Sequence, residues 1–269
     1  MAFSYEELAE IRHYIHQHPE LSGQEYQTTA FLKERLEELG IRILESGLKT
    51  GLIAEIGSGQ PVVALRADID ALPILEQTNL PYQSQNPGVM HACGHDFHQT
   101  SLLGAAALLK EKEDQLEGTV RLIFQPAEEI SEGASDVLAT GLLEDVQGII
   151  GFHNIPQLKA GQLALNAGAM MAGVEKFKVT VTGSVSHAAR PDLGVDTVTA
   201  VTTMVQNLQL LISRTVSPFE TAVLSITHLD VGSTWNVLPK SGYFEGTIRS
   251  FNPSVQRELK EHFVLSFVT

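Results

Sequence analysis

Apolar residues recur every three or four positions near the start of the chain, which predicts two amphipathic helices. The first begins after Ser4, because Ser4 and Glu7 have the spacing of a capping box. We expect His16, which lies on this helix, to be a surface residue. The second helix is predicted over residues 27–39, with Gly40 as its stop.

Short apolar runs then alternate with helical stretches. This alternation predicts an α/β sheet that lies between helices. In such sheets, ligand sites gather just past the carboxyl ends of the strands. Polar residues that can carry chemistry lie at these points, so we expect a site at one edge of the sheet. The predicted strands are 52–56, 62–67, 120–124 and 148–152, and the predicted helices are 100–110 and 135–143.

The pattern changes near residue 173. A strand, a long helix, two strands and a last helix follow one another, and this order is typical of a small ferredoxin-like α+β domain, which normally closes with one more strand. We therefore predict two domains, residues 1–172 and 173–269. The elements expected in the second are strand 174–182, helix 196–214, strands 221–229 and 242–250, and a helix from Pro253.

Composition narrows the possible partners. The chain has 269 residues and a net charge of −14, from 18 basic and 32 acidic side chains. Nucleic acids and anionic membranes bind basic surfaces, so neither is an expected partner. No apolar run is long enough to span a bilayer, and the acidic start of the chain is not a signal peptide. The single cysteine fits a reducing compartment, and we expect a cytoplasmic protein.

Three short segments together offer a thiolate, imidazoles and paired carboxylates, which are the groups of a hydrolytic metal site. They are His-Ala-Cys-Gly-His-Asp-Phe-His at 91–98, Gln-Pro-Ala-Glu-Glu at 125–129 and His-Asn-Ile-Pro at 153–156. Cys93 and His95 are two residues apart and can converge on one ion. Glu129 and His153 would add an oxygen and a nitrogen ligand. Because Glu128 and Glu129 are adjacent, one can bind metal while the other stays free as a general base.

Other residues near these segments each have two possible roles. Asp70 can orient a metal ligand, but a structural role for the cluster of Arg66, Asp68 and Asp70, as a buried salt bridge, is an alternative. His98 lies three residues after His95 and is either a partner of a metal ligand or a packed core histidine; His91 is equally open.

The segments resemble the amidohydrolases of the aminoacylase superfamily, in the branch of hippurate hydrolase, the indoleacetyl-amino-acid hydrolases and bacterial N-acyl-amino-acid amidohydrolases. The resemblance also rests on Arg-Ala-Asp-Ile-Asp-Ala-Leu-Pro at 66–73 and extends along essentially the whole chain. It implies a zinc-peptidase-like α/β/α sandwich as catalytic domain, with an inserted ferredoxin-like lid domain that also forms a homodimer. Two divalent metal ions (Zn²⁺, Mn²⁺, Ni²⁺ or Co²⁺) are implied as cofactors, and a thiolate ligand favours zinc.

The resemblance implies a role for each matching residue. The metal ligands are Cys93, His95, Glu129 and His153, the catalytic base that activates a metal-bound water is Glu128, and Asp70 is the carboxylate behind a ligand. In the lid, His187 reaches the reacting carbonyl, commonly from the partner subunit, while Asn236 and Arg249 hold the substrate. Ser186 and Asp192 depart from the family's usual glycine and histidine.

The implied reaction is hydrolysis of the amide bond of N-acyl-amino acids. Within the family, a dipeptidase or carboxypeptidase has the same ligand set and stays an alternative. Family members continue beyond the length of this chain and add a last histidine ligand, so a truncated product that only binds metal or dimerises is a second alternative. A thiol-based enzyme is weaker, because it leaves the paired glutamates unexplained.

Overall fold

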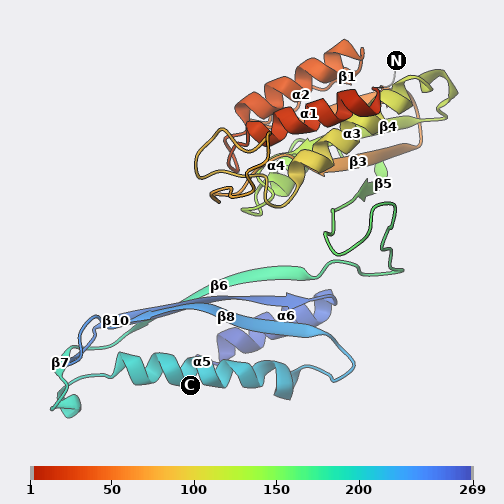
Figure 1. Ribbon diagram of the computed structural model, residues 1–269. Coiled ribbons are helices and arrows are strands. Elements are labelled where there is room, and N and C mark those ends of the chain that lie inside the picture. Colours follow the sequence, from red (N-terminus) through yellow and green to blue (C-terminus); the bar gives the residue numbers. More distant parts are fainter. Residues whose placement is uncertain (1–2, 268–269) are drawn as a thin grey trace. The chain divides into compact units, whose positions relative to one another are not determined.

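The computed structural model describes residues 3–267. They form two compact units, which divide between Lys159 and Ala160 (Figure 1). The expected boundary lay after residue 172, where the first strand of the second unit, β6, begins at Gly173. The two boundaries differ only in which unit residues 160–172 join, and the predicted domain limits stay a prediction.

A five-stranded sheet with the strand order β1-β2-β4-β3-β5 forms the centre of the first unit. Strands β3, β4 and β5 are parallel, so their carboxyl ends lie at one edge of the sheet, whereas β2 is antiparallel to β4 and β1 to β2. The strands are β1 (Arg42–Ile43), β2 (Leu52–Gly57), β3 (Val62–Asp68), β4 (Thr119–Gln125) and β5 (Val146–Gly151).

Helices cover both faces of this sheet, as expected for an α/β sandwich. Alternate residues of a strand point to opposite faces, and Leu122 and Phe124 of β4 face a core built with α1, α2 and α3. Ile123, between them, packs on the other face with Val137 of α4. The helices are α1 (Tyr5–Gln17), α2 (Tyr26–Glu38), α3 (His95–Lys110), α4 (Gly133–Ala139) and the short 3₁₀ helix η1 (Glu113–Gln115).

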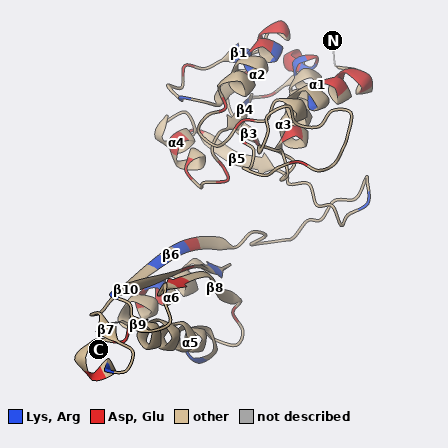
Figure 2. Cartoon of the chain, turned by 60° about the vertical axis from the view of Figure 1, so that its left-hand side comes forward, with Lys and Arg blue, Asp and Glu red and all other residues tan. Residues whose placement is uncertain are grey.

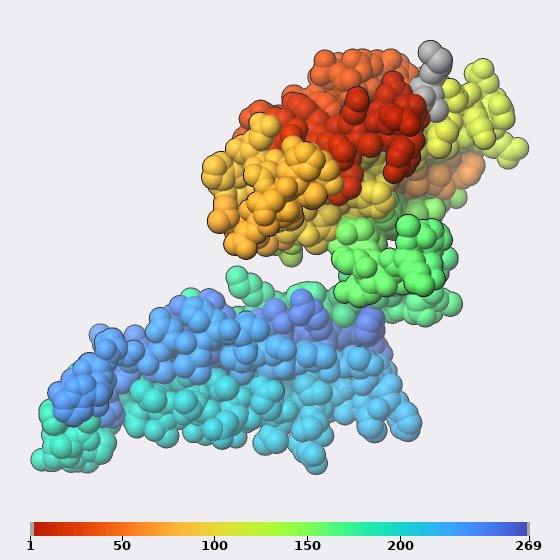
Figure 3. Space-filling model, in the orientation of Figure 1, coloured from red at the N-terminus to blue at the C-terminus, as the bar shows by residue number. Residues whose placement is uncertain are grey.

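The start of α1 confirms the predicted capping box, because the Ser4 hydroxyl accepts from the Glu7 N–H and the Glu7 carboxylate accepts from the Ser4 N–H. The expectation for His16 is wrong. Only 5% of this residue is exposed, because the long loop between β3 and α3 covers the end of α1 (Figure 3). Within that loop, Gln85 N–H donates to the Gln17 carbonyl.

Both basic and acidic residues lie on the outer surfaces of α1 and α2 (Figure 2). On α2, Lys33 pairs with Glu37 and Arg35 with Glu38, one helical turn apart. Such exposed pairs contribute little to stability. Among residues 3–267, no helix is both long and apolar enough to cross a membrane.

The second unit has three long antiparallel strands in the order β6-β10-β8, with β10 in the middle. Both long helices pack on one face, where Val201, Phe244 and Leu259 are buried in a common core. The main elements follow the predicted order: β6 (Gly173–Thr182), α5 (Thr197–Thr215), β8 (Ala222–Val231), β10 (Ser241–Ser250) and α6 (Pro253–Leu265). Shorter elements are β7 (Ser186–His187), η2 (Pro191–Leu193) and β9 (Val237–Leu238).

Candidate metal centre

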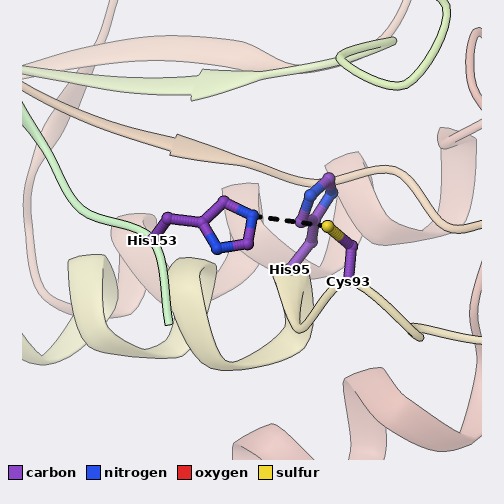
Figure 4. Close-up of side chains that lie close together, drawn as sticks. All are labelled: Cys93, His95 and His153. Atoms are coloured by element: carbon purple, nitrogen blue, oxygen red, sulfur yellow. Dashed lines mark hydrogen bonds between the residues drawn. The ribbon is translucent and has the colours of Figure 1, made fainter. Parts of the chain in front are cut away.

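The carboxyl-terminal edge of the parallel strands brings the three predicted segments together. Cys93 ends the loop that leads into α3, His95 is the first residue of that helix, and His153 follows β5 (Figure 4). The Sγ atom of Cys93 lies 3.3 Å from Nε2 of His153. One ligand atom from each of these three residues lies within 4.8 Å of the others, which is the spacing of groups that share an ion.

The loop after β4 adds two carboxylates to this cluster. Glu128, Glu129 and His95 also offer ligand atoms within 4.8 Å of one another. Nε2 of His95 and Oε1 of Glu129 are 3.6 Å apart, and both atoms are buried without a hydrogen-bond partner in the described part of the chain. A buried polar atom without a partner is costly. A cation between these two atoms would satisfy both, so the residues present fit a bound metal ion.

The electrostatics of the cluster also favour a cation. Burial, and then the negative charge of Glu129, raises the pKa of the Cys93 thiol to about 12. Burial and the charges of Glu129 and Asp68 likewise raise the pKa of Glu128. The carboxylates of Glu128, Glu129 and Asp68 lie close together and repel one another and the Cys93 thiolate. A divalent ion would therefore stabilise the thiolate and the carboxylates together.

Asp70 orients His95 from behind. Nδ1 of His95 lies 2.8 Å from the Asp70 carbonyl oxygen and 3.2 Å from Oδ1, so this nitrogen carries the proton and Nε2 keeps its lone pair for the cluster. Although burial alone would lower the pKa of His95, its hydrogen bond to Asp70 and the charge of Asp68 raise it. Oδ2 of Asp70 accepts from the Glu129 N–H at 2.9 Å and from Ser22 at 2.6 Å. Asp70 thus contacts both His95 and the backbone of Glu129.

Arg66 pairs with Asp68 and not with Asp70. Its guanidinium lies 2.7 Å from Oδ2 of Asp68, and the other carboxylate oxygen lies 2.6 Å from Nδ1 of His98. Burial would raise the pKa of Asp68, but the hydrogen bond from His98 and the charges of His95 and Arg66 hold it at about 2. His98 is therefore a buried, hydrogen-bonded residue next to the cluster.

The three residues expected in a lid domain lie in the second unit, whereas the cluster lies in the first. His187 is exposed on β7, which pairs with β9, and the Ala188 N–H donates to the Asn236 carbonyl, so the structure brings His187 and Asn236 together. Arg249 is exposed near the far end of β10, where it pairs with Val174 of β6. Arg249 is therefore not close to the other two. The roles expected for these three residues stay predictions.

Sequence reasoning placed Asp68 in a possible buried salt bridge with Arg66, gave no role to Asn154 and left those of His98 and His91 open. His91 is buried, and neither of its ring nitrogens has a partner among residues 3–267. The only sequence signal for His98 is its spacing from His95, one turn along the same helix. Nothing in the sequence indicates that Asn154, beside a predicted ligand, contacts this histidine.

Residues 64–249 match the model of a protein family described as Peptidase family M20/M25/M40. The chain belongs to this family. The resemblance read from the motifs is thereby confirmed, and the matched range contains every residue assigned a role above: Asp70, Cys93, His95, Glu128, Glu129, His153, His187, Asn236 and Arg249.

Several relatives of this M20-family chain carry informative names. It is 48% identical over 259 residues to N-acetyl-L-cysteine deacetylase of Bacillus subtilis (strain 168), covering 96% of this chain and 62% of the relative. It is 39% identical over 253 residues to N-acyl-L-amino acid amidohydrolase of Geobacillus stearothermophilus, covering 93% and 68%. The chain thus spans about two thirds of the length of these relatives.

A solved structure has the same fold. The Bacillus subtilis YXEP protein, described as a dinuclear metal binding peptidase from M20 family, superimposes with a TM-score of 0.80 at 44% sequence identity. The match covers 96% of this chain and 68% of that one. The mixed α/β architecture of this M20-family chain is therefore shared with a protein described as binding a dinuclear metal centre.

Proposed function

We propose that this chain binds two divalent metal ions and hydrolyses the amide bond of N-acyl-amino acids. The observation that carries the proposal is the convergence of Cys93, His95 and His153 beside two glutamates, with unpartnered buried atoms on His95 and Glu129. The names of the two bacterial relatives support the substrate class. The dinuclear description of the YXEP protein supports the number of ions.

The ligands proposed are Cys93, His95, Glu129 and His153. This donor set mixes sulfur, nitrogen and oxygen, which suits zinc and also admits manganese, nickel or cobalt. When bound, divalent ions supply Lewis acidity at the amide carbonyl and make water more acidic. The protein's part is to hold the ligand atoms in place, and Asp70 does so for His95 by contacting its Nδ1.

Glu128 is the proposed general base. It adjoins Glu129 in a loop, so one carboxylate can face the ions while its neighbour stays free to exchange protons. Burial raises the pKa of Glu128 toward the range in which a carboxyl group both accepts and returns a proton. In the proposed reaction Glu128 accepts a proton from the attacking water and then delivers it to the departing amine.

Residues of the second unit are proposed to hold the substrate. The Arg249 guanidinium is exposed and donates at 3.3 Å to the neutral hydroxyl of Thr247; no carboxylate partner is found for it in the part of the chain that the structure describes. It is therefore a suitable clamp for the carboxylate of an amino acid. Because Asn236 and His187 are not close to Arg249 within one chain, we propose that they come from the other subunit of a homodimer and contact the substrate near its amide, His187 as a donor to the developing oxyanion. A homodimer formed through this unit and a cytoplasmic location stay predictions.

A substrate panel tests the proposal. The chain, loaded in turn with Zn²⁺, Mn²⁺, Co²⁺ or Ni²⁺, is incubated with N-acetyl-amino acids and with dipeptides, and the released amine is measured. We expect metal-dependent release from N-acetyl-amino acids, abolished by a chelator and restored by metal. Release from dipeptides alone would instead favour a peptidase. Metal loading without release from either class would mean that this chain is not a hydrolase by itself.

A further inference from the structure

A buried line of polar groups connects strand β3 with the loop that carries His153. Arg66 donates to Asp68, which accepts from Nδ1 of His98 at 2.6 Å. On the other side of the ring, the Asn154 N–H donates to Nε2 of His98 at 3.0 Å. His98 is fully buried, and Asp68 is 1% exposed. Buried polar residues that are paired at every step fix one another's geometry.

Both ring nitrogens of His98 have partners. Asp68 is held ionised and can only accept, so Nδ1 of His98 must be the donor. Nε2 lies 3.0 Å from the backbone nitrogen of Asn154 and 2.6 Å from Oδ1 of the Asn154 side chain. A neutral Nε2 accepts from the N–H, whereas a protonated Nε2 donates to Oδ1, so one of these two bonds is made at a time. In either state His98 holds Asn154 in place.

Asn154 in turn fixes the tautomer of His153. The Asn154 carbonyl lies 2.8 Å from Nδ1 of His153, and a carbonyl can only accept, so this nitrogen carries the proton. The lone pair of His153 is consequently on Nε2, the atom that lies 3.3 Å from Cys93 Sγ. The hydrogen bond on one ring nitrogen sets which nitrogen is free for a metal.

Gly94 shows independently that the position of Asn154 is built into the site. This glycine, with a φ of +86°, lies between Cys93 and His95. A Cβ atom at this position would collide with the side-chain amide of Asn154. The turn before α3 thus leaves room for Asn154, so that the loop after β5 docks beside two proposed ligands.

We propose that His98 is a positioning residue. Through Asn154 it selects the tautomer of His153 and aims Nε2 of His153 at Cys93. The inference rests on the proposed function only for the identity of the metal ligands. The hydrogen-bond relay from Asp68 to His153 is a property of the metal-free chain, so it can be tested without metal or substrate.

The test is ¹⁵N NMR of the histidine rings in the metal-free chain, at a pH above the ordinary histidine pKa. The variant His98→Phe keeps a ring of similar shape and removes both nitrogens. In the parent chain we expect His153 to carry its proton on Nδ1. In His98→Phe we expect signals of a mixture of tautomers or of the Nε2–H form. Co²⁺ affinity, measured by titration, should also fall by roughly 10–100-fold, as is usual when the partner of a metal ligand is lost.

The control is His91→Phe, because His91 is a buried histidine without hydrogen-bond partners in the described chain. It should leave the His153 tautomer as in the parent. A folded His98→Phe variant in which His153 keeps its proton on Nδ1 would overturn the proposal. If His98→Phe does not fold, Asn154→Ala replaces it, since this loop substitution removes the amide beside Gly94 and should loosen His153 in the same direction. An unchanged tautomer there would equally overturn it. Loss of amide hydrolysis in the parent chain would leave this result untouched.

Discussion

The thiol of Cys93 and Nε2 of His153 face each other at 3.3 Å, although the two residues are 60 positions apart in the chain. One lies at the start of α3 and the other after the edge strand β5. Because the parallel strands end at the same edge, α3 and β5 bring the pair together without any local sequence relationship. In the metal-free chain the thiol, whose pKa is raised to about 12 by burial first and then by the charge of Glu129, can donate to Nε2 of His153. A bound divalent ion would replace this proton and take both atoms as ligands.

We therefore predict that Cys93→Ala lowers the metal content of the chain after dialysis, measured by elemental analysis. The loss follows because the thiolate is the softest ligand in the set and the one most dependent on the ion. With Co²⁺, the parent should show absorption from sulfur-to-metal charge transfer, and the variant should lack it. Equal metal content and equal spectra in the two proteins would place the ion away from Cys93.

Glu128→Gln should keep the metal and lose turnover. The amide cannot accept a proton from water, and a positioned general base contributes roughly 10²–10⁴-fold to rate. Glu132→Gln, a neighbouring exposed acid, is the matched control and should retain activity. The measurements are metal per chain and initial rates on an N-acetyl-amino acid. A Glu128→Gln chain that keeps substantial turnover would move the base to another residue.

Asp70→Ala should weaken metal binding by roughly 10–100-fold, because His95 loses the carboxylate that orients its ring. The Glu129 N–H loses its acceptor at the same time. Ser22→Ala removes only one hydrogen bond to Asp70 and should have a much smaller effect. Competition with a chromophoric chelator measures both affinities, and similar values for the two variants would contradict an orienting role for Asp70.

Much of the fold could be predicted from the sequence because its elements have strong local signals. The alternation along β4 sends Leu122 and Ile123 to different cores, and the pattern of 120–124 already indicates a buried strand. The predicted helix at 100–110 begins earlier, at His95, directly after Gly94, whose positive φ places it outside the helix. A catalytic motif at a helix start has few apolar positions, so periodicity misses the first turn.

The parts that could not be predicted depend on contacts between distant segments. His16 has the spacing of a surface residue, yet the loop from β3 to α3 covers it and supplies Glu76 as a partner. The contact between His98 and Asn154 joins residues 56 positions apart. A single sequence carries no signal for either contact, since both depend on how loops pack against the helices.

The environment of His16 predicts a pH dependence of stability in the metal-free chain. Nδ1 of His16 lies 2.9 Å from Asp96, and Nε2 lies 3.2 Å from Glu76. Asp96 also accepts from Arg12. The rings of Tyr82 and His91 contact the His16 ring. The hydrogen bond to Asp96 raises the pKa of His16 above its ordinary 6.5, against the lowering effect of burial. A raised folded-state pKa means that the folded chain binds the proton more tightly than the unfolded chain. The stabilisation is therefore complete below pH 6.5 and is lost as the pH rises through the folded-state pKa.

His16→Gln should consequently lower the melting temperature most at pH values below 6.5, with a difference from the parent chain that shrinks as the pH rises. Tyr82→Phe alters a ring that contacts His16 while keeping the imidazole, so its melting temperature should follow the pH in the same way as that of the parent. Thermal unfolding followed by circular dichroism across this pH range measures all three proteins. A destabilisation by His16→Gln that is constant, or that grows with pH, would mean that His16 stabilises the fold by packing and not as a cation between Asp96 and Glu76.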